Sequence, residues 1–390
     1  MKRIIITTTL FILLLTVHVY GAHMLEETDF NIENFLHEQI EELDIKEIEN
    51  MIDIVNKDYR GVLPRLTLKD IIFDLMKGEL IFNYKELFNN LLHLFLKEIY
   101  VNMQFAIQLL VIAIIMGILK NVSNSFGGET VSDIAELICY GAAVALCIGS
   151  FRYVYSIASE TIFYMIGFMQ AVFPLIITLL ISTGNVASGA LFHPLILASI
   201  SIVTFITERV ILPAIFLSVL FFLINAMTKI NYIKKLASLL RQFAVVLMGL
   251  IVTLLSGMTA IKGVISSSAD NMLIKTAKFS VDKFIPIVGG YISDSVEMIM
   301  SCSALIKNAI GAVGLLFIIL IILIPILKLL AISLIYKGLA ILIEPLGIEN
   351  ISDSLNQMGN TVVILAAIVL FVAIMFMIMI TILISTGHLI

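Results

Sequence analysis

Residues that could support catalysis or bind a metal ion are sparse in this chain. The sequence contains no HExxH, GxSxG, Walker A or GxGD motif. His37 and Glu38 are adjacent, but the second histidine of a zinc protease motif is missing. Cys139, Cys147 and Cys302 are too few and too scattered for a metal site and favour buried packing. We therefore expect no enzymatic activity, no metal and no cofactor.

Charged residues between apolar runs are the next candidates, because an ionisable group in lipid usually faces a cavity or a partner. Glu208 and Arg209 separate two apolar runs. Either they cap a tight surface hairpin, with Pro213 in the first turn of the following helix, or one long kinked helix carries them as a buried pair. We favour the hairpin. Arg152 and Glu160 bracket another short connection, and we expect both to be solvated.

A polar gate or pathway is the function that the remaining candidates suggest. Asn185 and His193 lie in a polar segment that is either a gate or a plain turn. Lys337, within an apolar run, either extends to the membrane surface or lines a pathway. Pro174 and Pro286 have weakly similar surroundings, and broken helices in corresponding halves mark transport pathways. A match this short also arises by chance.

The elements that must position these residues are membrane helices. Apolar residues make up 60% of the chain and charged residues 14%, which excludes an ordinary soluble protein. The small residues Gly141, Ala142, Ala145 and Gly149 fall near one helix face, which favours close helix packing. The stretch from Leu329 to Ile343 is either a short span, a re-entrant piece or an interfacial helix. The spans that we predict are 101–119, 133–151, 162–181, 190–207, 210–227, 243–261, 309–327 and 361–384.

The N-terminus is typical of a secretory signal peptide over residues 1–22. Lys2 and Arg3 precede an apolar stretch, and the small residues Gly21 and Ala22 follow it. We predict cleavage after Gly21 or Ala22. The alternative is an uncleaved signal anchor.

Residues 23–100 hold most of the acidic charge. They contain 17 acidic and 8 basic side chains, a net charge of −9. Leu43, Ile48 and Ile52 recur near the helical period, so we predict an extracytoplasmic head of amphipathic helices. A negative head argues against nucleic acid as a partner and leaves basic proteins open.

The predicted fold class is all-α, a polytopic helical membrane protein of about eight spans with a small helical extracytoplasmic N-terminal region. After the head come a first membrane block at 101–261 with about six spans, an amphipathic and partly re-entrant linker at 262–308, and a second block at 309–390. Eight spans place the C-terminus outside, and a ninth would return it to the cytoplasm. The sequence leaves that parity open.

Several stretches, taken in order, resemble the stage III sporulation protein AE family of endospore-forming bacteria. The longest is TAKFSVDKFIP, from Thr276 to Pro286, which continues to LIKN at 305–308 and then Gly311 and Gly314. Others are FHP at 192–194, LASLLR at 236–241, IYK at 335–337, EPLG at 344–347 and, in the head, DIV at 53–55 and GVLP at 61–64.

The resemblance implies a subunit of a sporulation complex that links the mother cell and the forespore. It implies a multi-pass protein of the mother-cell membrane that surrounds the forespore. Its partners would be other proteins of the same operon, including a secretion-type ATPase and ring-forming membrane proteins, and a forespore-side protein across the intermembrane space. It implies no catalytic residue. The chain would then act either as a permease-like or channel-forming component, or as a scaffold that recruits the other subunits without conducting.

Overall fold

The structure is a computed structural model, and it leaves part of the chain undescribed. The predicted signal peptide with Gly21 and Ala22, most of the linker and Pro286 lie outside the described residues. The residues described are 46–58, 67, 71, 84–126, 129–227, 232–265, 270, 272, 275, 276, 279 and 289–386.

The predicted all-α fold class is confirmed for the described part of the chain, which contains helices and no strand. In order, the elements are α3 (Lys46–Asp58), α5 (Tyr84–Phe126), α6 (Glu129–Ser182), α7 (Val186–Ile206), the π-helix η1 (Thr207–Ile211), α8 (Leu212–Met227), α9 (Tyr232–Ile265), α11 (Gly289–Ile343), the 3₁₀ turn η2 (Glu344–Leu346) and α12 (Glu349–Ile384).

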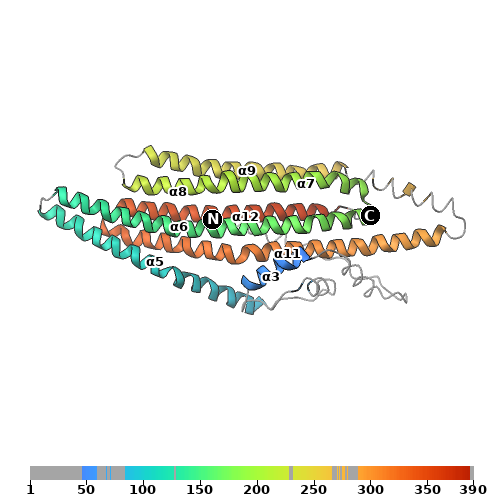
Figure 1. The fold of residues 1–390 in the computed structure, drawn as a ribbon, viewed down its shortest axis with the longest axis horizontal. Coiled ribbons are helices and arrows are strands. Elements are labelled where there is room, and N and C mark those ends of the chain that lie inside the picture. Colours follow the sequence, from blue (N-terminus) through green and yellow to red (C-terminus); the bar gives the residue numbers. More distant parts are fainter. Residues whose placement is uncertain are drawn as a thin grey trace. The chain divides into compact units, whose positions relative to one another are not determined.

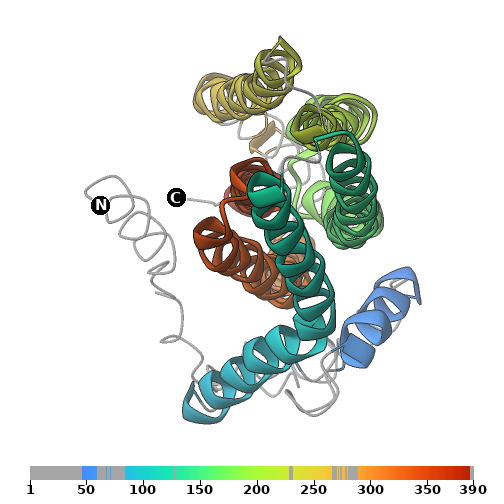
Figure 2. The same ribbon diagram turned by 90° about the vertical axis from the view of Figure 1, so that its left-hand side faces the viewer.

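The long helices lie side by side (Figure 1). α12 is central and packs against α6, α8, α9 and α11. Its Leu365, Val369, Val372 and Phe376 follow the helical period and are fully buried. α5 and α9 lie at the periphery, as the view along the helices shows (Figure 2). The interior between α6, α11 and α12 is therefore mainly apolar.

The prediction of about eight separate spans is not borne out, since six described helices are long and apolar enough to cross a membrane. α6 has 54 residues and α11 has 55. At 1.5 Å per residue each is about 80 Å long, more than twice the roughly 30 Å of a hydrocarbon core. Predicted spans join in α6, which contains 133–151 and 162–181, and across α7, η1 and α8, which contain 190–207 and 210–227. In α11 the span 309–327 continues into the stretch 329–343, whose nature the sequence left open.

The predicted hairpin at Glu208 and Arg209 is wrong. The chain continues from α7 into α8 through η1, in which one turn is a π-helix. The reason lies at Pro213, which has no N–H to donate to the carbonyl of Arg209 and whose ring would collide with that carbonyl. The wider π turn accommodates this defect without ending the helix. The kinked long helix was the correct alternative, but Arg209 is exposed and Glu208 half-buried, so they are no buried pair.

The closest helix contact joins α11 and α12. A methyl group at Gly311 would lie 2.3 Å from Cγ1 of Ile384, and one at Gly359 would lie 2.8 Å from Cγ of Lys337. Ser333 Oγ also donates a hydrogen bond of 2.9 Å to the Gly359 carbonyl oxygen. Small residues thus let these two backbones approach closely.

The predicted close packing at Gly141 and Gly149 does not occur. A methyl group at either position would meet no atom within 4 Å. A small residue permits a close contact but does not require one, and in the described part of the chain no helix lies against this face of α6.

Among the described residues of the head, α3 is a separate helix, whereas residues 84–100 form the first part of α5. In α3, Ile48 and Ile52 are buried, whereas Glu49 and Asp53 are exposed. α3 packs against α6 and α11, where Met51 lies against Gly167. The amphipathic pattern of the head therefore serves to seat a helix on the membrane bundle.

Candidate functional site

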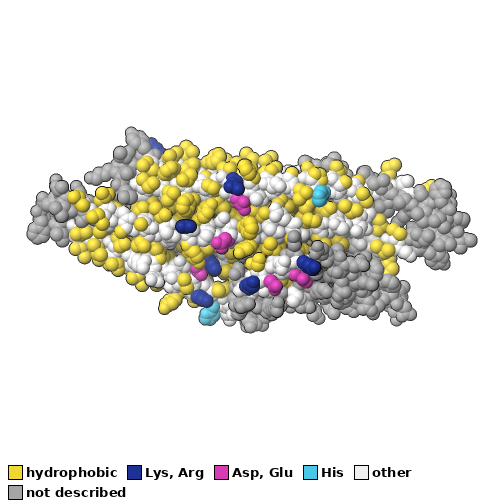
Figure 3. Space-filling view, viewed as in Figure 1, with side chains coloured by type: hydrophobic (Ala, Val, Ile, Leu, Met, Phe, Trp, Pro, Cys, Tyr) yellow, Lys and Arg dark blue, Asp and Glu magenta, His cyan; other side chains and the backbone are white. Residues whose placement is uncertain are grey.

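Charged side chains gather near the middle of the long helices, between two areas dominated by apolar side chains (Figure 3). α6 contributes Glu160, and Tyr164 lies one turn further on the same face. Lys328 lies one turn beyond Pro325 in α11. We call the set Glu160, Glu208, Arg209 and Lys328 the mid-bundle cluster.

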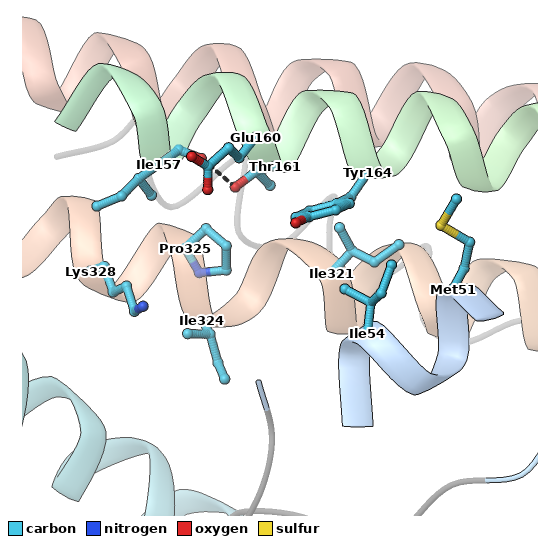
Figure 4. A pocket seen from close by; sticks show the side chains of 10 residues that line it. All are labelled: Met51, Ile54, Ile157, Glu160, Thr161, Tyr164, Ile321, Ile324, Pro325 and Lys328. Atoms are coloured by element: carbon cyan, nitrogen blue, oxygen red, sulfur yellow. Dashed lines mark hydrogen bonds between the residues drawn. The ribbon is translucent and has the colours of Figure 1, made fainter. Parts of the chain in front are cut away.

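A pocket of about 180 Å³ lies at this level between α6, α11 and α3 (Figure 4). Glu160, Thr161 and Tyr164 extend into it from α6, and Lys328 lies on the opposite side in α11. Met51 and Ile54 of α3, with Ile157, Ile321, Ile324 and Pro325, complete its wall. Thr161 Oγ1 donates to the Ile157 carbonyl oxygen at 2.6 Å, so that hydroxyl is satisfied within α6. The remaining polar groups of the pocket are those of Glu160, Tyr164 and Lys328.

A second, more open hollow adjoins the first. It is lined by Glu160 and Tyr164 again, by Ser159 and Phe163, and by Glu208 and Arg209 of η1. Glu160 and Tyr164 therefore lie between the two hollows. The mid-bundle cluster thus forms a polar surface that crosses α7–η1–α8, α6 and α11 at one level.

Within the described residues, none of the four charged members of the cluster forms an ion pair with another. Glu160 and Arg209 are exposed, and Glu208 and Lys328 are half-buried, so inside a bilayer these charges would need water or a polar partner. Thr207, the first residue of η1, is fully buried, and its Oγ1 has no hydrogen-bond partner in the described part of the chain. π segments recur at functional sites, and this one lies beside the cluster. The arrangement suits a small ligand or ion that carries both kinds of charge or is polar throughout.

The candidates Pro174, Asn185 and His193 come together at one end of the bundle, away from the cluster. His193 stacks on Phe173, next to Pro174, with ring centroids 5.6 Å apart. Asn185 is buried in the turn between α6 and α7, and its Nδ2 donates to Thr183 Oγ1 at 2.8 Å. α6 runs through Pro174 without a break, so no broken helix lies there.

The turn at this end is held from a distant part of the sequence. Asp270 is buried, and its carboxylate accepts hydrogen bonds from the backbone N–H of Ala187 at 2.9 Å and from Ser188 N–H and Oγ. A carboxylate at the first N–H groups of α7 satisfies them and complements the helix dipole. This geometry supports the plain-turn alternative for the segment, with Asp270 as its cap.

Two lysines of α11 have different surroundings. Lys337 is half-buried, and its aliphatic stem lies on Gly359 of α12. Lys307 is fully buried, and its Nζ donates to the backbone carbonyl of Thr386 at 2.5 Å, at the C-terminal end of α12. A cation there satisfies an orphan carbonyl and complements the dipole. Both lysines therefore serve the α11–α12 pair.

The sequence candidates thus divide into separate groups. Glu208 and Arg209 belong to the mid-bundle cluster, whereas Pro174, Asn185 and His193 lie at one end and Lys337 on the α12 side. Glu160, Tyr164 and Lys328 were missed. The sequence contained a signal for Glu160 and Tyr164. If residues 152–161 are taken as helix rather than as a loop, these two side chains lie on one face at the i, i+4 spacing.

Comparison with known proteins gives two matches that cover most of the chain. Residues 66–387 match the family model described as stage III sporulation protein AE. A curated relative, the stage III sporulation protein AE of Bacillus subtilis (strain 168), is 29% identical over 332 residues, which are 85% of this chain and 83% of that protein. No solved structure matches the chain.

Proposed function

Because this chain belongs to the stage III sporulation protein AE family, we propose that it is the channel-forming or permease-like membrane subunit of a sporulation complex. Family membership gives the chain a role in sporulation, and its long apolar helices are those of a membrane protein. The proposed complex links the mother cell and the forespore, and this chain lies in the mother-cell membrane around the forespore. It works there with a secretion-type ATPase and ring-forming proteins from the same operon.

The observation that carries the transport role is the mid-bundle cluster. Scaffold helices in lipid need apolar surface and small residues, but they gain nothing from unpaired charges around a pocket. Glu160 and Lys328 line a pocket of about 180 Å³, and Glu160 also lines the hollow that Arg209 borders. Polar groups from three helix segments at one level are what a pathway for small polar solutes requires.

The test removes charge from the cluster while preserving shape. Glu160→Gln and Lys328→Gln each delete one charge-assisted contact, which is worth about 1.5–3 kcal/mol. A loss of about 1.4 kcal/mol lowers occupancy about tenfold, so heat-resistant spore counts should fall strongly while the membrane content of the protein stays normal. Lys234→Gln is the matched control, because Lys234 pairs with Asp353 at 2.8 Å outside the pocket and is exposed. Normal sporulation of both cluster variants would refute the transport role.

The scaffold is the second candidate, and α3 is the observation that favours it. α3 is seated on the bundle by its apolar face and presents Glu49, Asn50 and Asp53 outward. Glu49 and Asp53 are one helical turn apart on the same face, and two such carboxylates suit a basic group of a partner protein. Charge reversal by Glu49→Lys with Asp53→Lys should abolish sporulation if the chain is a scaffold. The same change should have little effect if the pocket is what matters.

A further inference from the structure

The outward face of α5 is the surface that neither the pocket nor the bundle core uses. α5 lies at the edge and, among the described elements, packs mainly against α6 and α11, with a few contacts to η2 (Figure 2). Of the residues in the most apolar 18-residue window of this helix, only 28% are buried. The types of the exposed side chains on α5 indicate whether lipid, water or protein covers them.

The exposed face of α5 carries a continuous polar stripe. Its spacing of three or four residues keeps all members on one side of the helix. From Asn89 to Gln108 the stripe is about 28 Å long at 1.5 Å per residue, and its last two members lie within the apolar span that begins at Val101. The members, all exposed, are Asn89, His93, Lys97, Tyr100, Gln104 and Gln108.

α9 is a suitable comparison for α5, because lipid can cover its exposed face. It is equally peripheral, with 22% of its apolar part buried. Its exposed positions include Val246, Leu250 and Leu254. Thr253 is also exposed, but its Oγ1 donates to its own helix at Gly249, 2.8 Å away. Exposed polar atoms on this part of α9 are thus satisfied locally, as lipid demands.

Gln104 and Gln108 have no such local partner. Within the described part of the chain neither side chain forms a hydrogen bond. An amide exposed to hydrocarbon without a partner costs several kilocalories per mole by transfer scales. These two residues lie within a charge-free stretch from Val101 to Leu119 that is long enough to span. The face must therefore meet water or another polar surface.

We propose that α5 lines a water-filled path enclosed by several copies of this chain, with Gln104 and Gln108 facing the lumen. Direct packing of one α5 stripe on another would place Lys97 near its own copy, and like charges in contact repel. In a lumen these ammonium groups face water instead. The proposal rests on the proposed transport function and adds where the path runs.

The same stripe continues with apolar residues beyond Gln108. Val111, Ile115 and Ile118 follow at the same spacing and are exposed. A ring of such residues from several copies forms a hydrophobic constriction, which closes a pore to water until it widens. The stripe therefore contains a polar entrance and an apolar gate along one helix.

The test measures the water access of single cysteines in the full chain within cells. Cys147 and Cys302 are buried and can remain, so only Cys139 is replaced by alanine. The resulting starting variant should not react with the thiol reagent. Cysteine is then introduced at Gln104 and Gln108, at the exposed Met103 and Ile114 to the side of the stripe, and at Val246 and Leu250 on α9. A membrane-impermeant charged thiol reagent is applied to sporulating cells, and the spore count of each variant confirms that it folds.

The expected result is rapid labelling at Gln104 and Gln108, with Met103, Ile114 and the α9 positions at least about tenfold slower because lipid excludes the charged reagent. Three outcomes overturn the proposal. Equal labelling around α5 places the helix in bulk water. Disulfide dimers without labelling indicate direct contact between copies, and neither signal indicates lipid. None of these outcomes bears on Glu160 and Lys328, so the transport role would fail or stand separately.

Discussion

Gly359→Ala should destabilise the bundle, although alanine is the better helix former. The added methyl group would lie 2.8 Å from Lys337 Cγ and 3.3 Å from the backbone carbonyl oxygen of Ser333. The side chain of Lys337 can shift, but the Ser333 carbonyl belongs to the backbone of α11. Relief therefore requires α11 and α12 to separate by a few tenths of an ångström.

The magnitude follows from three terms. Overpacking of a close contact costs about 1–3 kcal/mol. Separation of the helices also weakens the 2.9 Å hydrogen bond from Ser333 Oγ to the Gly359 carbonyl, worth about 1 kcal/mol. Replacement of glycine by alanine inside a helix stabilises the helix by about 1 kcal/mol, which offsets part of this loss. The net loss should be about 1–3 kcal/mol, or about 2–4 °C in Tm per kcal/mol by the scaling of medium-sized domains.

The assay uses the protein's own thiols. In detergent, with the half-buried Cys139 replaced by alanine, Cys147 and Cys302 react with a fluorogenic maleimide only when the bundle opens, because they are 2% and 5% exposed. Gly338→Ala is the matched control in the same helix pair, since a methyl group there meets nothing within 4 Å. It should leave Tm unchanged or raise it. Equal Tm values for the Gly359 and Gly338 variants would refute the close α11–α12 approach.

Three further predictions concern polar contacts. Tyr336→Phe removes the 2.7 Å hydrogen bond between Tyr336 Oη and Ser150 Oγ, which should cost about 1 kcal/mol in the thiol assay, and Ser150→Ala should add little to it. Asp270→Ala should cost about 1 kcal/mol and speed amide exchange in the first turn of α7, whereas Asp270→Asn should lose less. Asp353→Asn should change stability by less than about 1 kcal/mol, because Lys234 and Asp353 are 44% and 61% exposed; a larger loss would show a buried pair.

The sequence correctly indicated helical membrane structure, because apolar runs of bilayer length admit few other solutions. The prediction failed where charged residues between two apolar runs were interpreted as a loop. The segment from Arg152 to Glu160 contains neither glycine nor proline, so nothing in it ends a helix. Pro325 likewise lies inside α11, where neighbouring helices support the chain. Charge between apolar runs marks polar surroundings, and it does not by itself mark a turn.

Only part of the candidate site could be predicted from the sequence, because charged residues were interpreted as loop residues. Glu208 and Arg209 stood out because they interrupt an apolar run, and they do belong to the mid-bundle cluster. Glu160 was set aside as a loop residue, and Lys328 lay at the end of a predicted span. Which helices face each other decides that these residues share a pocket, and no local pattern carries that information. Asp270, which caps α7 from 82 or more residues away, is a second case.

The position of α3 decides how the mid-bundle cluster meets its surroundings. Among the α3 side chains that the structure describes, the exposed charged ones are Lys46, Glu49, Asp53 and Lys57. Four charges in hydrocarbon would cost about 10 kcal/mol or more, against about 3–6 kcal/mol that α3 gains from burial of Ile48 and Ile52. The outward side of α3 must therefore face water. Since Met51 and Ile54 of the same helix wall the pocket of Glu160 and Lys328, that pocket opens beside a water-facing surface. We infer that a polar solute reaches the cluster without first crossing lipid.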